Sequence, residues 1–570
     1  MKTFETVPIR KPAYNVFNLS HDVKATYNFD KLYPFFCHPV NPGETFNVRV
    51  ESFMRTMPLI APVMHNVDQF FYFFFVPFRL LWNADRKRNW QTFITGGEKG
   101  DFGDHGYPNA QGAPEFADYV LPHFNYRQRE MLSSDSDKVL FEPGSLLDHM
   151  GFPSVASDQS VNAARTEPIC SLPFRAYQMI WNEYFRNQNV QNEIEFSYDR
   201  GLETTVNLVK LLTMRKKCWE KDYFTSCLPW QQRGEAMSLP VLVPSGLTGT
   251  VPVTVNTGKL SNGTLEGALV ANNTTASNRT TVAISGALGA GQNDPVELSG
   301  SANLANGVNV KFTGLSIGTI TDLRYCLRLQ QWLENNARCG SRYIEQILAH
   351  FGVVSSDSRL QRPELLGGGK LPLLFSDIPQ TSASDDESVQ GNLSGKGTLY
   401  GKTGGFKKYF EEHGVIIGLT CIIPRTSYSQ GIPRYWTAMD KTDWYFPEFA
   451  HLSEQAVLNK ELYYDFTASN NVDPTLNPDG VFGYQGRYTE YRYVPSSVHG
   501  EMRNTLQSWH LGRLFPSLPR LNSSFVECDS RVNVFALEDI SENGADPFVC
   551  QLHLDIKAVR PMPKFAVPSI

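Results

Sequence analysis

The chain has 570 residues and a net charge of −6. This length is too great for one simple core. The negative net charge does not suit a protein that binds nucleic acid over its whole surface. A mean hydropathy of −0.30 is typical of a soluble protein, and the 37 Phe, 24 Tyr, 35 Pro and 43 Gly favour strands joined by irregular loops over helix bundles.

Cysteine usage and apolar runs indicate which compartment suits the protein. The nine cysteines are an odd number, scattered and without a CxxC pair, which predicts free, mostly buried thiols in a reducing compartment. Met1–Arg10 has no apolar stretch of the kind that a secretory signal needs. The apolar run Phe70–Phe78 is far shorter than the roughly 18 residues of a membrane-spanning helix.

The first third of the chain has the periodicity of strands. Residues 44–50 alternate, with Phe46, Val48 and Val50 on one face, which predicts a half-buried strand. Residues 67–76 are apolar on both faces from Phe70 onward, so that strand must be covered on both sides or lie against a neighbouring subunit. Residues 101–171 are rich in Gly, Pro, Asp and His and are predicted to form long loops.

A first helix is predicted over residues 172–187. Phe174, Ile180, Trp181 and Tyr184 recur at helical spacing, and Pro173 occupies a first-turn position.

Residues 231–311 differ from everything around them. This stretch contains no Phe, Trp, Tyr, His or Cys, although average usage would place roughly ten aromatic residues in it. Because packed cores draw much of their burial from aromatic side chains, we interpret the segment as a separate surface unit inserted into an aromatic-rich body.

Two more helices are predicted after this insertion. One begins with Thr321 as N-cap and ends before Gly340. The other runs from Ser341 as N-cap to Phe351, with Gly352 as the residue that ends it.

The last third returns to strands. Residues 415–423 form a buried apolar run, residues 487–494 alternate loosely, and residues 550–558 alternate cleanly. The few helices never alternate regularly with strands, so a parallel α/β sheet is not expected. An antiparallel sandwich with large inserted loops fits better.

Short motifs with catalytic associations carry little weight here. Gly314–Gly318 (GLSIG) matches the nucleophile-elbow pattern, but no downstream Asp and His stand in a recognisable arrangement. Gly401–Thr403 (GKT) lacks the earlier glycine and the buried strand of a phosphate-binding loop. His105, His123 and His149 lack metal-ligand spacing. We therefore predict no catalytic, cofactor or metal site, and no enzyme.

One basic and aromatic cluster has the composition that single-stranded nucleic acids require. Trp82 and Trp90 flank the cations Arg79, Arg86, Lys87 and Arg88, so that cations could hold phosphates while aromatic faces stack on bases. The alternative is a solvated turn beside core tryptophans. Both interpretations stay open on the residues alone.

Two classes of function are consistent with these features of the sequence. One is a structural or assembly protein with extensive contacts between subunits. The other is a carbohydrate-binding or carbohydrate-cleaving β-sandwich, which predicts a signal peptide, aromatic platforms and a carboxylate pair. The sequence provides no signal peptide and no evident pair.

Several blocks of sequence, in order along the chain, resemble the major capsid protein of the Microviridae, and specifically its gokushovirus-like branch. The blocks include Phe17–Lys24 (FNLSHDVK), Pro58–His65 (PLIAPVMH), Phe75–Trp82 (FVPFRLLW), Ala450–Glu461 (AHLSEQAVLNKE) and Ala558–Pro563 (AVRPMP). Shorter ones are Phe93–Gly97, Ser341–Glu345, Arg359–Glu364, Phe482–Gln485 and Glu490–Tyr493. The resemblance covers essentially everything except residues 231–311.

This resemblance implies a mainly β fold, an eight-stranded antiparallel jelly roll with long loop insertions and a few helices. It also implies pentamers and a T=1 icosahedral shell of sixty copies around a circular single-stranded DNA genome. Expected partners are an internal scaffolding protein and DNA-packaging or pilot proteins. The protein would be found in the virion and would assemble in the cytoplasm of a host bacterium, with Arg86, Lys87 and Arg88 on the inner surface of the shell.

The resemblance also gives the domain plan an interpretation. Residues 1–230 and 312–570 would form the two parts of the jelly-roll body. Residues 231–311 stand where this branch carries a surface insertion that clusters at the three-fold axes, and they are expected to contact a host cell-surface receptor.

Overall fold

A computed structural model describes residues 13–82, 89–95, 121–234, 320–339, 342–381, 384, 390–452, 454–466, 477–537 and 545–565. The chain divides into two compact units, Met1–Gly234 with Leu333–Ile570, and Glu235–Trp332. The described residues of the second unit, 320–332, begin helix α7 (Ile320–Arg338). Positions 235–311 of the predicted insertion lie outside the described residues, so its boundaries stay a prediction.

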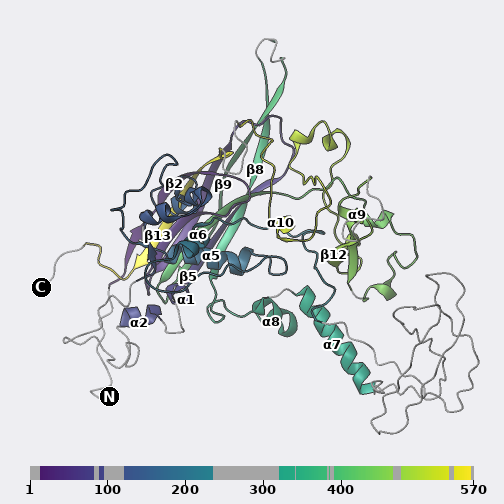
Figure 1. Ribbon diagram of the computed structural model, residues 1–570, viewed down its shortest axis with the longest axis horizontal. Coiled ribbons are helices and arrows are strands. Elements are labelled where there is room, and N and C mark those ends of the chain that lie inside the picture. The colour runs from purple at the N-terminus through teal and green to yellow at the C-terminus, as the bar shows by residue number, and fades with distance from the viewer. Residues whose placement is uncertain are drawn as a thin grey trace, which may run out of the picture. The chain divides into compact units, whose positions relative to one another are not determined.

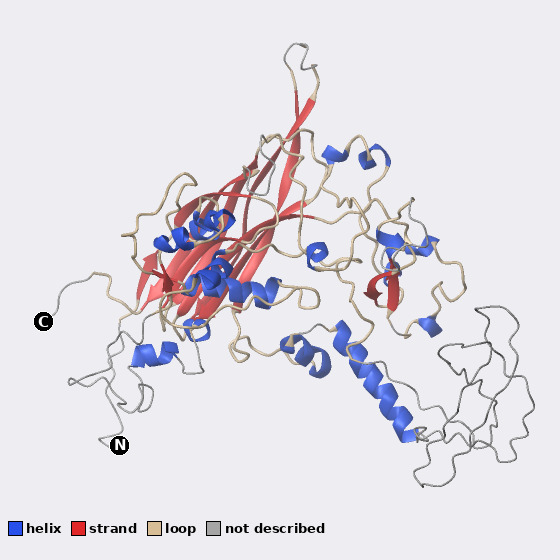
Figure 2. Ribbon diagram, viewed as in Figure 1, coloured by secondary structure: helices blue, strands red, loops and turns tan. Residues whose placement is uncertain are grey.

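An antiparallel sheet of nine strands forms the body of the first unit (Figures 1 and 2). Neighbouring strands follow the order β1-β13-β4-β9-β8-β5-β10-β3, and β2 also pairs with β13. The strands are β1 (Asn15–Asn18), β2 (His21–Tyr27), β3 (Tyr33–Val40), β4 (Thr45–Thr56), β5 (Val67–Pro77), β8 (Glu364–Pro379), β9 (Leu393–Tyr409), β10 (Gly414–Pro424) and β13 (Phe548–Arg560). The predicted mainly β, antiparallel class is confirmed. The sheet has nine strands rather than eight because β1 and β2 share one edge of β13.

Strand β5 is covered on both faces, as its sequence predicts. Phe71, Phe73 and Phe75 point into one apolar core, which the curled sheet encloses. Phe70 and Phe74 point into a second core, between the sheet and a layer of helices and loops. Its neighbour β10 divides its side chains between the same two cores, so this strand pair separates them.

The alternation predicted for residues 550–558 is confirmed in β13. Cys550, Leu552, Leu554, Ile556 and Ala558 are buried in the first core. The intervening Gln551, His553 and Lys557 are exposed on the opposite face. Strand β4 alternates in register with β13, so four neighbouring strands, β2, β13, β4 and β9, present one polar face to solvent.

Glycines allow β8 and β9 to bend where the sheet curls. A Cβ atom on Gly405 would lie 1.9 Å from the carbonyl oxygen of Val48, and one on Gly404 would lie 2.2 Å from that of Gly368. The β4–β9 register shifts at the same level, between Arg49 and Val50. Only residues without a side chain permit this close approach of three backbones.

The longer helices form largely as predicted. Helix α5 (Leu172–Ile180) continues into a π turn (Trp181–Phe185), which together match the expected helix over 172–187. Helix α6 (Thr205–Leu212), capped by Thr204, has no counterpart among the predicted elements. Helix α8 (Tyr343–Phe351) ends at Gly352 with φ of 67°, as expected, but its N-cap is Arg342 and not Ser341. Helix α7 begins at Ile320, so Thr321 lies inside it.

The described residues between 425 and 535, here called the loop lobe, supply most of a third core, to which Tyr223, Phe224 and Cys227 also belong. Its sheet is the hairpin of β11 (Gln455–Leu458) and β12 (Val481–Gln485). The strand predicted over 487–494 is wrong: Thr489–Tyr491 form a 3-10 turn that begins at Tyr488, whose φ is 60°. A ring that is buried by tertiary contacts holds Tyr488 in this left-handed conformation.

The remaining elements are short. They are α1 (Phe78–Leu81), α2 (Asn89–Thr95), β6 (His123–Phe124), α3 (Asp135–Lys138), α4 (Leu146–His149), β7 (Ile169–Cys170), α9 (Asn459–Leu462) and α10 (Ser523–Val526), with 3-10 turns at Tyr126–Met131, Val139–Phe141, Arg434–Trp436, Pro447–Phe449, Gly500–Arg503 and Gln507–Trp509. Within the described residues, no helix combines the length and apolarity that crossing a membrane requires.

Candidate functional surfaces

The basic and aromatic cluster predicted from the sequence is only partly described. Arg79, on α1, forms an ion pair with Glu412 (Nε to Oε2, 2.6 Å) and also donates to Gln361, so its charge is already compensated. Trp82 is fully buried in the second core, and its indole face is not accessible to a base. The contact predicted for Trp82 is therefore wrong for the folded chain. Arg86, Lys87 and Arg88 lie outside the described residues.

The short catalytic motifs find no support where they can be tested. Gly401–Thr403 lies inside strand β9, where the ladder leaves no loop to cradle a phosphate, and Lys402 forms an ion pair with Glu51. Gly314–Gly318 and His105 lie outside the described residues. Across the described part of the chain, no three His, Cys, Asp or Glu side chains are placed to hold a metal ion.

The loop lobe exposes many large apolar side chains. Trp436, Met439 and Phe466 are 70%, 87% and 91% exposed. Others in the lobe are Trp444, Tyr445, Phe446, Leu452, Tyr491, Tyr493, Val494 and Leu506. Aromatic residues and Met are enriched where proteins meet other proteins, so this surface has the composition of a contact region.

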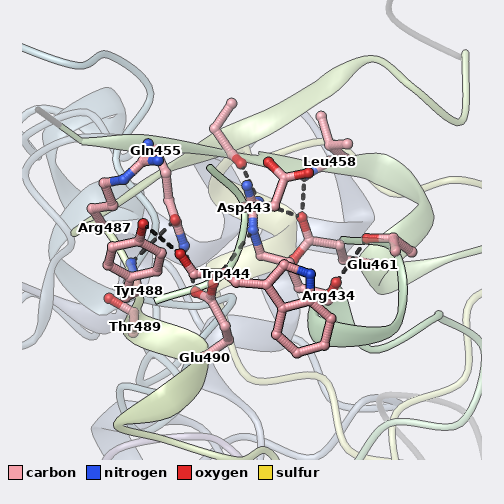
Figure 3. Close-up of polar contacts among 12 residues, drawn as sticks. Arg434, Asp443, Trp444, Gln455, Leu458, Glu461, Arg487, Tyr488, Thr489 and Glu490 are labelled. Atoms are coloured by element: carbon pink, nitrogen blue, oxygen red, sulfur yellow. Dashed lines mark hydrogen bonds and ion pairs between the residues drawn. The ribbon is translucent and has the colours of Figure 1, made fainter. Parts of the chain in front are cut away.

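A largely buried polar network links several segments of the loop lobe (Figure 3). Arg434 donates through Nη1 to Glu461 (2.9 Å) and lies 3.7 Å from Glu490 through Nε. Gln455 donates to Glu490 (2.5 Å) and accepts from the backbone of Tyr488 (3.1 Å). The network therefore connects a 3-10 turn, the β11–β12 hairpin and α9.

The aromatic loop is tied to the same network. The Tyr488 hydroxyl hydrogen-bonds to the carbonyls of Thr442 and Trp444, at 3.2 and 3.0 Å. Arg487 adds a bond to the carbonyl of Thr442 (2.8 Å). Because exposed apolar side chains bind partners best when their positions are fixed beforehand, these bonds preorganise the surface.

The carboxylates of this network are strongly desolvated. Glu461 is 2% and Glu490 is 7% exposed, against 25% for Arg434. Burial raises the pKa of the Glu461 carboxyl above its ordinary value, although Arg434 and the Leu458 amide act against this. Burial, with the nearby Glu461, also raises the pKa of Tyr223, whose hydroxyl donates to Glu461 (2.8 Å).

The sequence did not identify this network before the fold was known. Glu461 and Glu490 belong to two of the blocks that carry the family resemblance, but nothing in those blocks pairs them with Arg434. Their separation of 27 to 56 residues along the chain gives no local signal.

Comparison with known proteins is consistent along the chain. Residues 6–570 match the family model of the phage capsid protein (F protein). The chain is 32% identical to the capsid protein VP1 of Bdellovibrio phage phiMH2K, over 100% of this chain and 97% of the relative. It is 32% identical to that of Chlamydia phage 1 (100% and 97%) and 31% identical to that of Spiroplasma virus 4 (97% and 94%). Of the two function classes left open by the sequence, these similarities support the structural one.

Proposed function

Because the chain belongs to the phage capsid (F protein) family, we propose that sixty copies of it close a T=1 icosahedral shell around a circular single-stranded DNA genome. At the coarser level, the chain is a structural capsid protein of a virion and not an enzyme. The match over residues 6–570 carries this conclusion, since it includes both the sheet and the loop lobe.

Contacts between copies are supported by surfaces that one chain leaves uncovered. The aromatic side chains of the loop lobe, including Trp436 and Phe466, are exposed in the single chain. Covering them against neighbouring copies would supply the apolar burial that permanent interfaces require. Pentamers are the assembly intermediate that we propose.

The genome and the other virion components complete the proposal. A net charge of −6 means that this chain alone does not neutralise a nucleic acid, so we propose a DNA-packaging or pilot protein and an internal scaffolding protein as partners. Arg86, Lys87 and Arg88 remain proposed contacts to the genome on the inner surface. Assembly in the bacterial cytoplasm agrees with nine cysteines, several of them buried.

Residues 231–311 are proposed to contact a receptor on the host. Their support is the composition, since a segment without aromatic residues contributes little to a core and suits an outer surface.

Mass and shape of the assembled protein test the shell directly. Sixty chains of 64.2 kDa give about 3.9 MDa, which sedimentation and light scattering measure while negative-stain images show whether the particles close. Closed particles near this mass, or pentamers that close when a scaffolding protein is added, are the expected result. A strict monomer at high concentration, with or without that protein, would refute the proposal.

A further inference from the structure

The solvent-facing side of β2, β13, β4 and β9, here called the polar sheet face, carries an ordered set of side chains. Register places Lys24, Gln551, Phe53 and Tyr400 in one row across the four strands. The next row toward one end contains Thr26, Val549, Arg55 and Thr398, and the next toward the other end contains Asp22, His553, Glu51 and Lys402.

Cations on this face outnumber the acids that could neutralise them. Asp22 is hydrogen-bonded to His553 (2.6 Å), and Glu51 is paired with Lys402. Among the described residues, no acidic side chain lies within ion-pair distance of Lys24, of Arg55 or of Lys396, which stands two residues before Thr398 on β9. The face therefore offers positive charge to a polyanion.

Two aromatic side chains stand beside these cations. Phe53 and Tyr400 are direct cross-strand partners, and they are 38% and 74% exposed. Directly opposed side chains on antiparallel strands have Cβ atoms about 5 Å apart, so the two side chains are neighbours on this face. The Arg55 guanidinium lies over the Phe53 ring, 5.0 Å from its centroid.

A cavity of about 1010 Å³ opens beside Phe53. Its lining includes Lys24, Phe53 and Arg55 together with residues of β3 and α4, among them Asp148. It lies between β2 and β3, which no ladder joins in the described sheet. The cavity is large enough for several nucleobases.

Two buried polar atoms at this cavity lack a hydrogen-bond partner among the described residues. They are Oη of Tyr27 and Nε2 of His149, and both residues line the cavity. Burial lowers the pKa of His149, which favours the neutral ring that can accept as well as donate. Buried polar atoms are seldom left unsatisfied, so these two are expected to bond to water or to a ligand group that reaches them.

We propose that the polar sheet face and its cavity bind single-stranded nucleic acid. Lys24 and Arg55 hold phosphates, Phe53 and Tyr400 stack on bases, and a base edge enters the cavity toward Tyr27 and His149. Sequence-tolerant binding of single strands uses this combination of cations and stacking platforms. The inference rests on the proposed enclosure of a single-stranded genome and adds a location to it.

A second copy of the chain is the less suitable occupant. The cores of protein–protein interfaces are depleted of charged residues. The centre of the polar sheet face instead contains Lys24, Arg55 and the Glu51–Lys402 pair around only two aromatic rings.

Oligonucleotide binding by the full-length chain tests the site. The probe is a fluorescein-labelled 15-nucleotide oligo-dT, measured by anisotropy over a range of salt concentrations. The variants are the double substitution Lys24→Gln with Arg55→Gln, and Tyr400→Ala. The control is Lys441→Gln, which removes an exposed cation from the loop lobe.

We expect the double substitution to weaken binding at least tenfold and to reduce the slope of log K against log salt by about 1.4, since each lost phosphate contact removes about 0.7. Tyr400→Ala should weaken binding about fivefold or more. The control should match the unmodified chain. Equal binding by the double variant and the control, or no binding by the unmodified chain, would overturn the proposal.

Particles separate this inference from the capsid proposal. Ultraviolet crosslinking of filled particles should attach nucleotides to peptides that contain Phe53 or Tyr400. Filled particles of normal mass whose crosslinks map only elsewhere would refute this site and leave the shell intact. Variants that bind the oligonucleotide normally but fail to assemble would assign the face to contacts between copies, and that also refutes it.

Discussion

Replacing Arg434 by alanine should loosen the loop lobe measurably. The substitution leaves Glu461 and Glu490 buried without their cation, at 2% and 7% exposure. Breaking a fully buried ion pair costs about 3–5 kcal/mol. Arg434 is 25% exposed, so water screens part of the interaction, and we expect a loss of about 2–3 kcal/mol.

Native-state hydrogen exchange reports this loss where it occurs. Amides of β11 and β12 should exchange about 30- to 150-fold faster, because each factor of ten corresponds to about 1.4 kcal/mol. Amides of β13, in the sheet, should keep their protection. The matched control is Arg492→Ala, which removes an exposed arginine from the same lobe.

The pH dependence supplies a second check on the reasoning. In the variant, the raised pKa of Glu461 rises further because the neighbouring cation is gone. A carboxyl with a raised pKa binds protons more tightly in the folded state than in the unfolded one, so its stability contribution is lost as pH rises through the folded pKa. The loss should be smaller at pH 5 than at pH 8, and Glu461→Gln should restore part of it. Exchange indistinguishable from that of Arg492→Ala, or a loss independent of pH, would refute the buried-pair explanation.

Three further predictions concern other parts of the first unit. Arg175→Ala leaves Glu203 (3% exposed) without the guanidinium 2.6 Å away. Thermal unfolding should therefore show a free energy of unfolding lower by about 3–5 kcal/mol. A decrease below about 1 kcal/mol would contradict a buried ion pair. Gly405→Ala should destabilise the sheet by about 1–3 kcal/mol or more, because the added Cβ atom meets backbone. The control Gly151→Ala, at a position with φ of 89° and open space around it, should cost only about 1 kcal/mol. Equal effects of the two substitutions would be inconsistent with the close approach at Gly405. Burial raises the pKa of the Cys421 thiol to about 11, so its contribution to stability is complete below pH 9 and is lost as pH rises through 11. The thiol should resist disulfide reagents at pH 8 until urea unfolds the chain. Rapid labelling of the native protein would contradict the burial of this thiol.

Periodicity alone located the main strands and several helices. The sequence predicts the strands at 44–50, 67–76, 415–423 and 550–558 because their signals are local. Half-buried strands alternate apolar and polar residues, and fully buried strands have continuous apolar runs. The strand expected at 487–494 failed because tertiary bonds to the Tyr488 side chain outweigh a loose local pattern. The same applies to Trp82. Its position beside cations predicts an accessible ring, but the helical layer covers that ring in the second core.

The residues by themselves therefore determined the mainly β class, the doubly covered strand β5 and the family, since each depends on local pattern or on ordered blocks of sequence. Only the tertiary structure decided which distant side chains meet. Phe53 and Tyr400 are separated by most of the chain and become neighbours through the β4–β9 register. Arg434, Glu461 and Glu490 come together because a turn, a hairpin and a helix pack on one core. Such pairings depend on how the chain closes its loops, and no local periodicity encodes that choice.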